Sequence, residues 1–173
     1  MSGFENFSSS YEELERHSFK EIPSVAIDTS PNIIPRINVS NRTILFDSIN
    51  NGKLDGQIIF HGGKLENWKI ILSDGLKLGY SKIAEERKSK NGYTGCITFN
   101  DLELLNIELF VENTQCEDAV HFVRVKGSIK NITVKNSRSD AIDADFSNVR
   151  FKNVVVEDAL NDCLDFSAGS YDI

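Results

Sequence analysis

A five-residue motif recurs along the chain at nearly constant spacing. Its copies begin at residues 74, 95, 118, 140 and 162, so they are 21, 23, 22 and 22 residues apart. The first position is Asp or Gly, the second is small, the third and fifth are apolar, and the fourth is mostly polar. A fixed period of this size indicates a solenoid, in which each repeat forms one turn. The alternation over the last three positions is typical of a strand.

Each repeat has room for three short strands. A second motif, an Asn followed by alternating apolar residues, occurs at Asn67, Asn106, Asn131 and Asn153. A third strand is indicated by apolar residues at 22-residue intervals, Ile129, Phe151 and Ile173. Helical crossovers would need longer connections than these gaps allow. The sequence therefore predicts an all-β parallel β-helix with about 22 residues per coil, and the leading asparagines are expected to stack as a side-chain ladder at a bend.

The chain divides into two regions. Residues 1–24 are a lead-in or a cap, and Ser10-Tyr11-Glu12-Glu13 fits a capping box that predicts a short N-terminal helix. Residues 25–173 form the β-helix, interrupted at 79–94 by a charged segment with a short helix at 81–90. The last coil is incomplete, because the chain stops at Ile173 before an Asn-led strand. An open coil exposes apolar side chains and backbone groups, so we expect either a fragment of a longer solenoid or self-association through this C-terminal coil.

Composition limits the partners. The chain has 26 Asp and Glu against 19 Lys and Arg, a formal net charge of −7, and no basic stripe accompanies the repeats, which argues against nucleic acid. No apolar run reaches the roughly 18 residues of a membrane-spanning helix. No secretory signal is visible, which favours a cytoplasmic location unless the chain is an excised piece of a surface protein. Of the three cysteines, Cys96 and Cys163 occupy the small second position and are expected to be buried.

The first and fourth motif positions place aspartates in neighbouring columns. Because coils stack at about 4.8 Å, the C-terminal half presents one candidate binding face made of Asp118, Asp140, Asp143, Asp162 and Asp165. Ca²⁺ selects clustered oxygen ligands, which makes Asp118, Asp140 and Asp162 candidate metal ligands. The structural alternative is that these three aspartates accept backbone N–H bonds in turns. Asp143 and Asp165 would then simply face solvent.

The repeat resembles the right-handed parallel β-helix superfamily, the pectate-lyase-like fold of polysaccharide lyases, polygalacturonases, phage tailspikes and many bacterial surface proteins. The resemblance covers residues 66–173 well and 25–65 loosely, and it is carried by the Asp-small-apolar triplets that begin at residues 118, 140 and 162 together with the Asn-led strands at 131 and 153. In that superfamily, lyases use Ca²⁺ held by Asp with an Arg or Lys base, and hydrolases use Asp pairs as acid and base. On this basis the candidate catalytic residues are His121, Asp143, Asp165 and Arg124, with a plain outward-facing residue as the alternative for His121.

The superfamily's catalytic signatures are missing from the sequence. It contains no Asn-Thr-Asp, no Gly-His-Gly and no Arg-Ile-Lys, and a shared fold does not confer a shared reaction. The sequence therefore favours a non-catalytic binding or scaffold module. It would present an acidic, Ca²⁺-binding face to a polysaccharide or protein partner as part of a larger protein or assembly. The alternative is a polysaccharide lyase or glycoside hydrolase of the pectate-lyase-like type.

Overall fold

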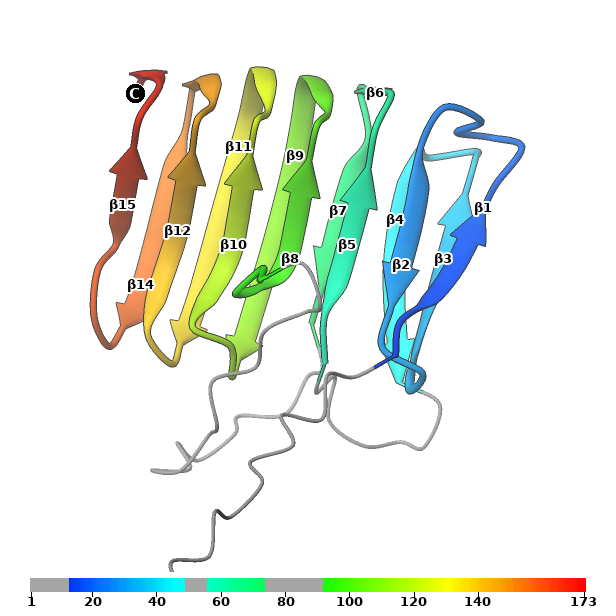
Figure 1. Ribbon diagram of the computed structural model, residues 1–173, viewed down its shortest axis with the longest axis horizontal. Coiled ribbons are helices and arrows are strands. Elements are labelled where there is room, and N and C mark those ends of the chain that lie inside the picture. The colour runs from blue at the N-terminus through cyan, green and yellow to red at the C-terminus, as the bar shows by residue number, and fades with distance from the viewer. Residues whose placement is uncertain (1–12, 49–55, 74–91) are drawn as a thin grey trace, which may run out of the picture.

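The computed structural model of the chain describes residues 13–48, 56–73 and 92–173 (Figure 1). These residues form strands and no helix. The strands stack as a parallel β-solenoid of about 5 turns, with equivalent positions about 23 residues apart. Figure 1 shows the turns side by side, from β1 at one end to β15 at the other. The all-β solenoid that the repeat predicts is confirmed.

Two sheets form the walls of the solenoid. Sheet A has the order β1 (Glu15–Ser18), β2 (Ala26–Thr29), β5 (Ile58–His61), β8 (Gly95–Asn100), β10 (Asp118–Val123), β12 (Asp140–Asp145) and β15 (Leu164–Ser167). Sheet B has the order β16 (Ser170–Asp172), β13 (Asn148–Phe151), β11 (Lys126–Ser137), β9 (Glu103–Thr114), β7 (Lys69–Leu72), β4 (Thr43–Ser48) and β3 (Ile33–Asn38). Two strands lie off this path, because β14 (Val154–Ala159) pairs with β11 and β6 (Lys64–Glu66) pairs with β9.

Residues one repeat apart are neighbours in sheet A. Val120 pairs with Ile97 on one side and with Ile142 on the other, in parallel register. All three side chains are fully buried, as expected for the third motif position when alternate residues of a strand point to opposite faces. The period therefore predicts which side chains share a column as well as the fold class.

The structure corrects the first copy of the motif. The strand that pairs with β8 is β5, with Ile58 opposite Ile97 and Phe60 opposite Phe99. Residues 56–60 therefore provide the rung before β8, with Gly56 at the first motif position. Residues 74–78, which were expected to form this rung, lie outside the described residues, as does the helix expected at 81–90. The coil between β5 and β8 is longer than the others because the chain between β7 and β8 is an insertion.

An aromatic stack runs through the core between the two sheets. The rings of Phe99 and Phe122 stack with their centroids 5.3 Å apart. The next residue in this register is Ala144, and Phe151 of sheet B contacts Phe122 there, at a centroid distance of 5.7 Å. A small residue on one sheet is thus matched by a large residue on the other, which keeps the interior close-packed.

The leading asparagines form ladder pairs. Asn106 Nδ2 donates to Asn67 Oδ1 at 2.6 Å, and Asn153 Nδ2 donates to Asn131 Oδ1 at 2.9 Å. Asn67 and Asn106 have φ values of 58° and 56°, in the left-handed region that asparagine tolerates. The register of β9 and β11 shifts just before Asn131, so Asn131 does not lie opposite Asn106 and the ladder consists of two separate pairs.

The N-terminal helix prediction is wrong where the structure describes this segment. Glu15–Ser18 forms β1, which pairs antiparallel with β2, while residues 1–12 lie outside the described residues. Arg16 also donates two hydrogen bonds to the carboxylate of Asp28, at 2.8 and 2.9 Å. The edge of β2 offers backbone hydrogen-bond partners to a further strand. A short helix with a weakly apolar face would gain little stability from packing, so this segment forms a strand.

The last coil has a neighbour on one side only, because β15 pairs with β12. Leu160, Leu164 and Ile173 are 59%, 37% and 65% exposed. Cys163 was expected to be buried, but it is exposed as a free thiol. The second motif position is buried in Cys96, Ala119 and Ala141, which have a coil on each side, and it is exposed in Cys163, which has a neighbouring coil on one side only. Self-association through this coil stays a prediction.

Candidate functional site

The fourth motif position forms a column along sheet A, in the order Thr98, His121, Asp143 and Asp165 on β8, β10, β12 and β15. The first position places Asp118 opposite Asp140 on β10 and β12. The repeat therefore stacks these acidic side chains on one side of the solenoid, as the sequence predicts. We call the five aspartates of the predicted binding face the acidic face: Asp118, Asp140, Asp143, Asp162 and Asp165.

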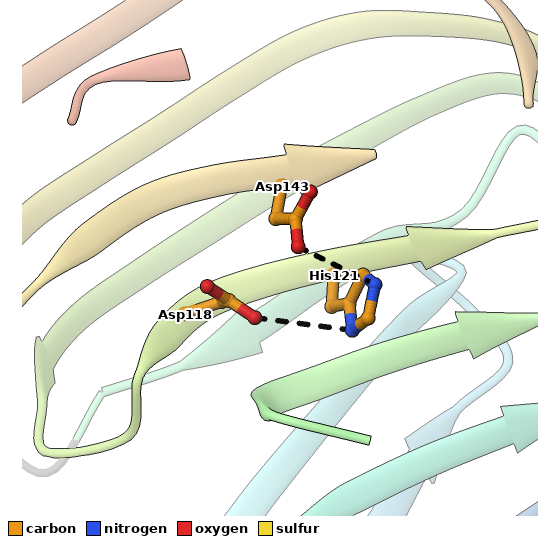
Figure 2. Close-up of side chains that lie close together, drawn as sticks. All are labelled: Asp118, His121 and Asp143. Carbon is orange, nitrogen blue, oxygen red and sulfur yellow. Dashed lines mark ion pairs between the residues drawn. The ribbon is translucent and has the colours of Figure 1, made fainter. Parts of the chain in front are cut away.

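His121 lies among three carboxylates, those of Asp118 and Asp143, which Figure 2 draws, and that of Asp145. Its Nε2 atom is 3.2 Å from Asp145 Oδ2 and 3.5 Å from Asp143 Oδ2. Its Nδ1 atom is 3.8 Å from Asp118 Oδ2. We call these four residues the His121 cluster. Asp118 and His121 are only 2% and 5% exposed, so strong mutual interactions are expected in a poorly solvated setting.

Two carboxyl groups of the His121 cluster are held partly protonated near neutral pH. Burial, followed by the charges of Asp145 and Asp165, raises the pKa of Asp143 to about 7. Burial also raises the pKa of Asp118 to about 6, against the opposing hydrogen bond from Thr94. Among the described residues, no Lys or Arg forms an ion pair with a carboxylate of the cluster or of the acidic face. The site therefore holds excess negative charge, a feature that recurs at functional sites.

Asp140, Asp162 and Asp165 form a second, more exposed group. One oxygen from each of the three carboxylates lies within 4.8 Å of the other two. Asp140 Oδ1 also accepts hydrogen bonds from the Asp162 backbone N–H at 3.0 Å and from Asn161 Nδ2 at 2.7 Å. Asp140 thus accepts a backbone N–H bond, as expected of a structural aspartate, but the N–H belongs to the next coil and not to its own turn. Of the predicted metal ligands, Asp140 and Asp162 share this group, whereas Asp118 belongs to the His121 cluster.

Arg124, the predicted lyase base, lies at the bend after β10. Its guanidinium donates to both oxygens of Asp101, at 2.7 and 3.0 Å, and to Asn100 Oδ1. The Asp101 hydrogen bond, followed by one with Tyr93, raises the pKa of Arg124, so this group is firmly cationic. Arg124 lines a hollow of about 370 Å³ with the exposed Phe146. The arginine thus adjoins the cluster without being part of it.

The segment just before β8 contacts the His121 cluster, and the repeat does not predict this contact. Thr94 Oγ1 donates to Asp118 Oδ2 and lies 3.2 Å from His121 Nδ1, and the ring of Tyr93 contacts that of His121 edge-on at 6.4 Å. Neither residue occupies a motif position, so the repeat carries no signal for them. The contact arises because β8 starts next to β10 in sheet A.

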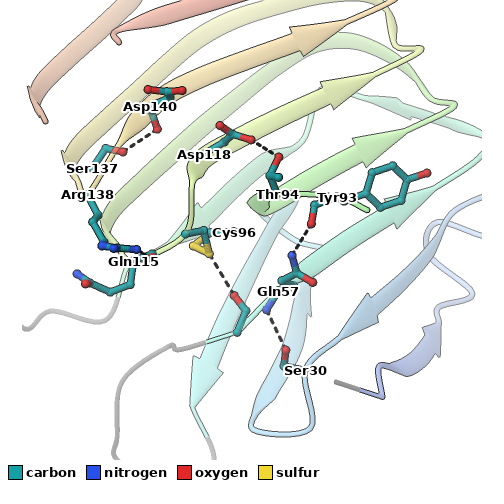
Figure 3. Close-up of a disulfide and its surroundings, with 12 residues drawn as sticks. Ser30, Gln57, Tyr93, Thr94, Cys96, Gln115, Asp118, Ser137, Arg138 and Asp140 are labelled. Carbon is teal, nitrogen blue, oxygen red and sulfur yellow. Dashed lines mark hydrogen bonds between the residues drawn. A yellow bond between two sulfur atoms is a disulfide. The ribbon is translucent and has the colours of Figure 1, made fainter. Parts of the chain in front are cut away.

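A disulfide joins the start of β8 to the residues just before β10, a contact that the repeat does not predict. Cys96 follows Thr94 by two residues, Cys116 precedes Asp118 by two, and their Cα atoms are 5.4 Å apart (Figure 3). Both cysteines are buried. The disulfide therefore holds together the two strand starts that position Thr94 against Asp118. Such bonds persist in oxidising compartments, which favours a location of that kind over the cytoplasm.

The disulfide spans 20 residues. Its reduction should lower the free energy of unfolding by about 3 kcal/mol, because the unfolded chain then regains the conformational entropy of a loop of this length. Urea unfolding with and without dithiothreitol measures the effect. The double variant Cys96→Ala, Cys116→Ala should be as unstable as the reduced protein and insensitive to the reductant. Equal stability of the oxidised and reduced protein would contradict the expectation.

Comparisons of the chain with protein-family models, with curated proteins and with solved structures find no match in any of the three. The β-solenoid is compatible with a parallel β-helix fold. Among the described residues there is no helix long and apolar enough to cross a membrane.

Proposed function

We propose that this chain is a non-catalytic binding module of a larger protein or assembly. It uses the acidic face to bind Ca²⁺ and, through it, an acidic polysaccharide or a protein partner. The observation that carries the proposal is the excess of carboxylates on one side of sheet A without an Arg or Lys ion pair among the described residues. Two like charges about 5 Å apart repel by about 3 kcal/mol at an effective dielectric of 20. A bound cation removes this repulsion.

The exposed group of Asp140, Asp162 and Asp165 suits Ca²⁺ best. Its donors are all oxygen atoms, which is the ligand type that Ca²⁺ selects, and its partial exposure leaves room for water or a ligand carboxylate. A hollow at the bends that follow β8, β10 and β12 supports a glycan as partner. It combines the exposed ring of Phe146 with the polar groups of Glu103, Lys126 and Asn148. Aromatic faces pack on sugar rings, and the carboxylate, ammonium and amide groups bond to sugar hydroxyls.

We expect Ca²⁺ to raise the melting temperature of protein treated with EDTA. Ligand at about 100 times its Kd stabilises the folded state by about 2.7 kcal/mol. Asp165→Asn should remove most of this gain, whereas Asp158→Asn should keep it, because Asp158 is an exposed residue of β14 outside the acidic face. Differential scanning calorimetry with and without Ca²⁺ provides the measurement. A wild-type melting temperature that ignores Ca²⁺ would contradict the proposal.

A polysaccharide lyase or glycoside hydrolase is the second candidate. One observation favours it: His121, Asp143 and Asp165 are consecutive members of one column, and the raised pKa of Asp143 suits a general acid. If the chain is an enzyme, acidic polysaccharides will yield unsaturated, ultraviolet-absorbing ends for a lyase or new reducing ends for a hydrolase. Asp143→Asn should then lower the rate by about 100-fold or more. Inactivity of the wild-type protein on a broad polysaccharide panel would leave the binding module.

A further inference from the structure

The two ring nitrogens of His121 have different surroundings. Nε2 faces Asp145 Oδ2 at 3.2 Å and Asp143 Oδ2 at 3.5 Å, so an N–H on this nitrogen is held by a carboxylate. Nδ1 then carries the lone pair, and it faces Thr94 Oγ1 at 3.2 Å and Asp118 Oδ2 at 3.8 Å. A carboxylate that fixes the tautomer and orientation of a histidine from behind is a common feature of metal sites.

The donor atoms of the cluster are spaced as metal ligands are. Asp118, His121 and Asp143 each offer one atom, and all three atoms lie within 4.8 Å of one another (Figure 2). Ligands on bonds of about 2.0–2.2 Å lie roughly 3–4.4 Å apart, so the 3.8 Å between Nδ1 and Asp118 Oδ2 needs no rearrangement. The set provides one nitrogen and two carboxylates, all on strands of a rigid sheet.

A buried hydroxyl beside the cluster is a second observation that points to a ligand. Thr98 precedes His121 in the column and is completely buried, yet its Oγ1 has no hydrogen-bond partner among the described residues. This oxygen and the His121 Cβ both pack closely over Gly95, since a Cβ added there would lie only 2.8 Å from each. An unsatisfied buried hydroxyl costs about 1–3 kcal/mol, so a polar ligand at the cluster that came within reach of Thr98 Oγ1 would be favoured.

We infer that His121, Asp118 and Asp143 form a binding site for a first-row divalent metal ion, Zn²⁺ above all, with Asp145 as the positioning carboxylate. An imidazole nitrogen among carboxylates suits Zn²⁺ and its first-row neighbours, whereas Ca²⁺ takes oxygen ligands. The burial of His121 excludes bulk water from the site. This site is separate from the group of Asp140, Asp162 and Asp165, and it does not depend on Ca²⁺ binding there.

Calorimetric titration of the whole, chelator-treated chain with ZnCl₂ tests the inference. We expect one Zn²⁺ per chain, at least about 100-fold weaker binding in His121→Gln, and about 10-fold weaker binding in Asp145→Asn. Asp158→Asn removes the same charge as Asp145→Asn from an exposed position and should bind Zn²⁺ as the wild type does. Circular dichroism checks that each variant is folded, and Asp143→Asn replaces His121→Gln if the latter is not. Substitution with Co²⁺ gives a second readout, because its visible absorption reports the coordination geometry and should change when His121 is replaced.

Absence of Zn²⁺ binding to the wild-type chain would overturn the inference, and so would Zn²⁺ binding that is equally tight in folded His121→Gln or Asp143→Asn. These failures differ from that of the proposed function. Ca²⁺ stabilisation that Asp165→Asn removes, together with no Zn²⁺ binding, would keep the acidic-face proposal and reject the histidine site. Zn²⁺ binding that requires His121, without any response to Ca²⁺, would do the reverse.

Discussion

Phe122→Ala is expected to lower the free energy of unfolding by about 4 kcal/mol, within the range for truncating a buried aromatic residue. Phe122 is completely buried, and its ring contacts those of Phe99 and Phe151. Its removal breaks the stack at the coil that carries His121. Neighbouring rings are held by coils on both sides, so the cavity can collapse only in part. Equilibrium urea unfolding measures the loss, with an unchanged m-value expected for a cooperative transition.

Phe146→Ala is the matched control, because Phe146 lies in the next coil but is 66% exposed. Surface substitutions of this kind change stability by about 0.5 kcal/mol or less. A similar loss in both variants would mean that the aromatic stack does not hold the coils together. A loss of less than about 1 kcal/mol in Phe122→Ala would contradict close packing at this level of the core.

The second large effect is a loss of stability with rising pH, measured in EDTA. The pKa of Asp143 is raised from an ordinary value of 3.8 to about 7 in the folded chain, so between these values the folded state binds more protons than the unfolded state. Its contribution is therefore fully present below about pH 4 and is lost as pH rises through 7, at a total cost of about 4 kcal/mol. Asp118, with its pKa raised to about 6, acts in the same direction. The groups that act on or face Asp143 are Asp118, His121, Asp140, Asp145, Asp165 and Tyr171.

Asp143→Asn should remove most of this dependence and should be more stable than the wild type at about pH 8, because the amide stays neutral. Asp158→Asn is the control and should retain the wild-type slope. Urea unfolding at a series of pH values gives the comparison. A wild-type protein whose stability rises between about pH 5 and pH 8 would contradict the expected loss, because the unfolded state would then bind more protons than the folded state over this range.

The repeat predicts those parts of the structure that depend on the period. Val120 and Ile142 are inward neighbours, and His121 and Asp143 are neighbours in the outward column, because a parallel ladder places residues one coil apart next to each other. The prediction fails where the chain leaves the period. Residues 56–60 take the place expected for 74–78, because an insertion follows β7. A fixed spacing of about 22 residues cannot identify a rung that is separated from the next one by an insertion.

A comparison of equivalent positions in successive repeats also does not predict contacts between residues at different positions of the repeat. Thr94 and Cys116 lie outside the motif, yet one bonds to Asp118 and the other forms the disulfide with Cys96. Three cysteines at irregular spacing do not reveal which two will be bridged, since only the folded chain sets the distance between their Cα atoms. The burial of His121 is likewise invisible in the sequence, where its position reads as outward and polar.

By itself, the sequence determined that the chain winds into stacked coils and that aspartates gather on one side, because a period of about 22 residues leaves parallel stacking as the arrangement that buries its apolar positions. Only the tertiary structure decided that these aspartates divide into an exposed oxygen-only group and a buried cluster around His121. That division depends on which strand starts lie against β10 and on how completely they exclude water, and solvent exclusion is a property of packing in three dimensions.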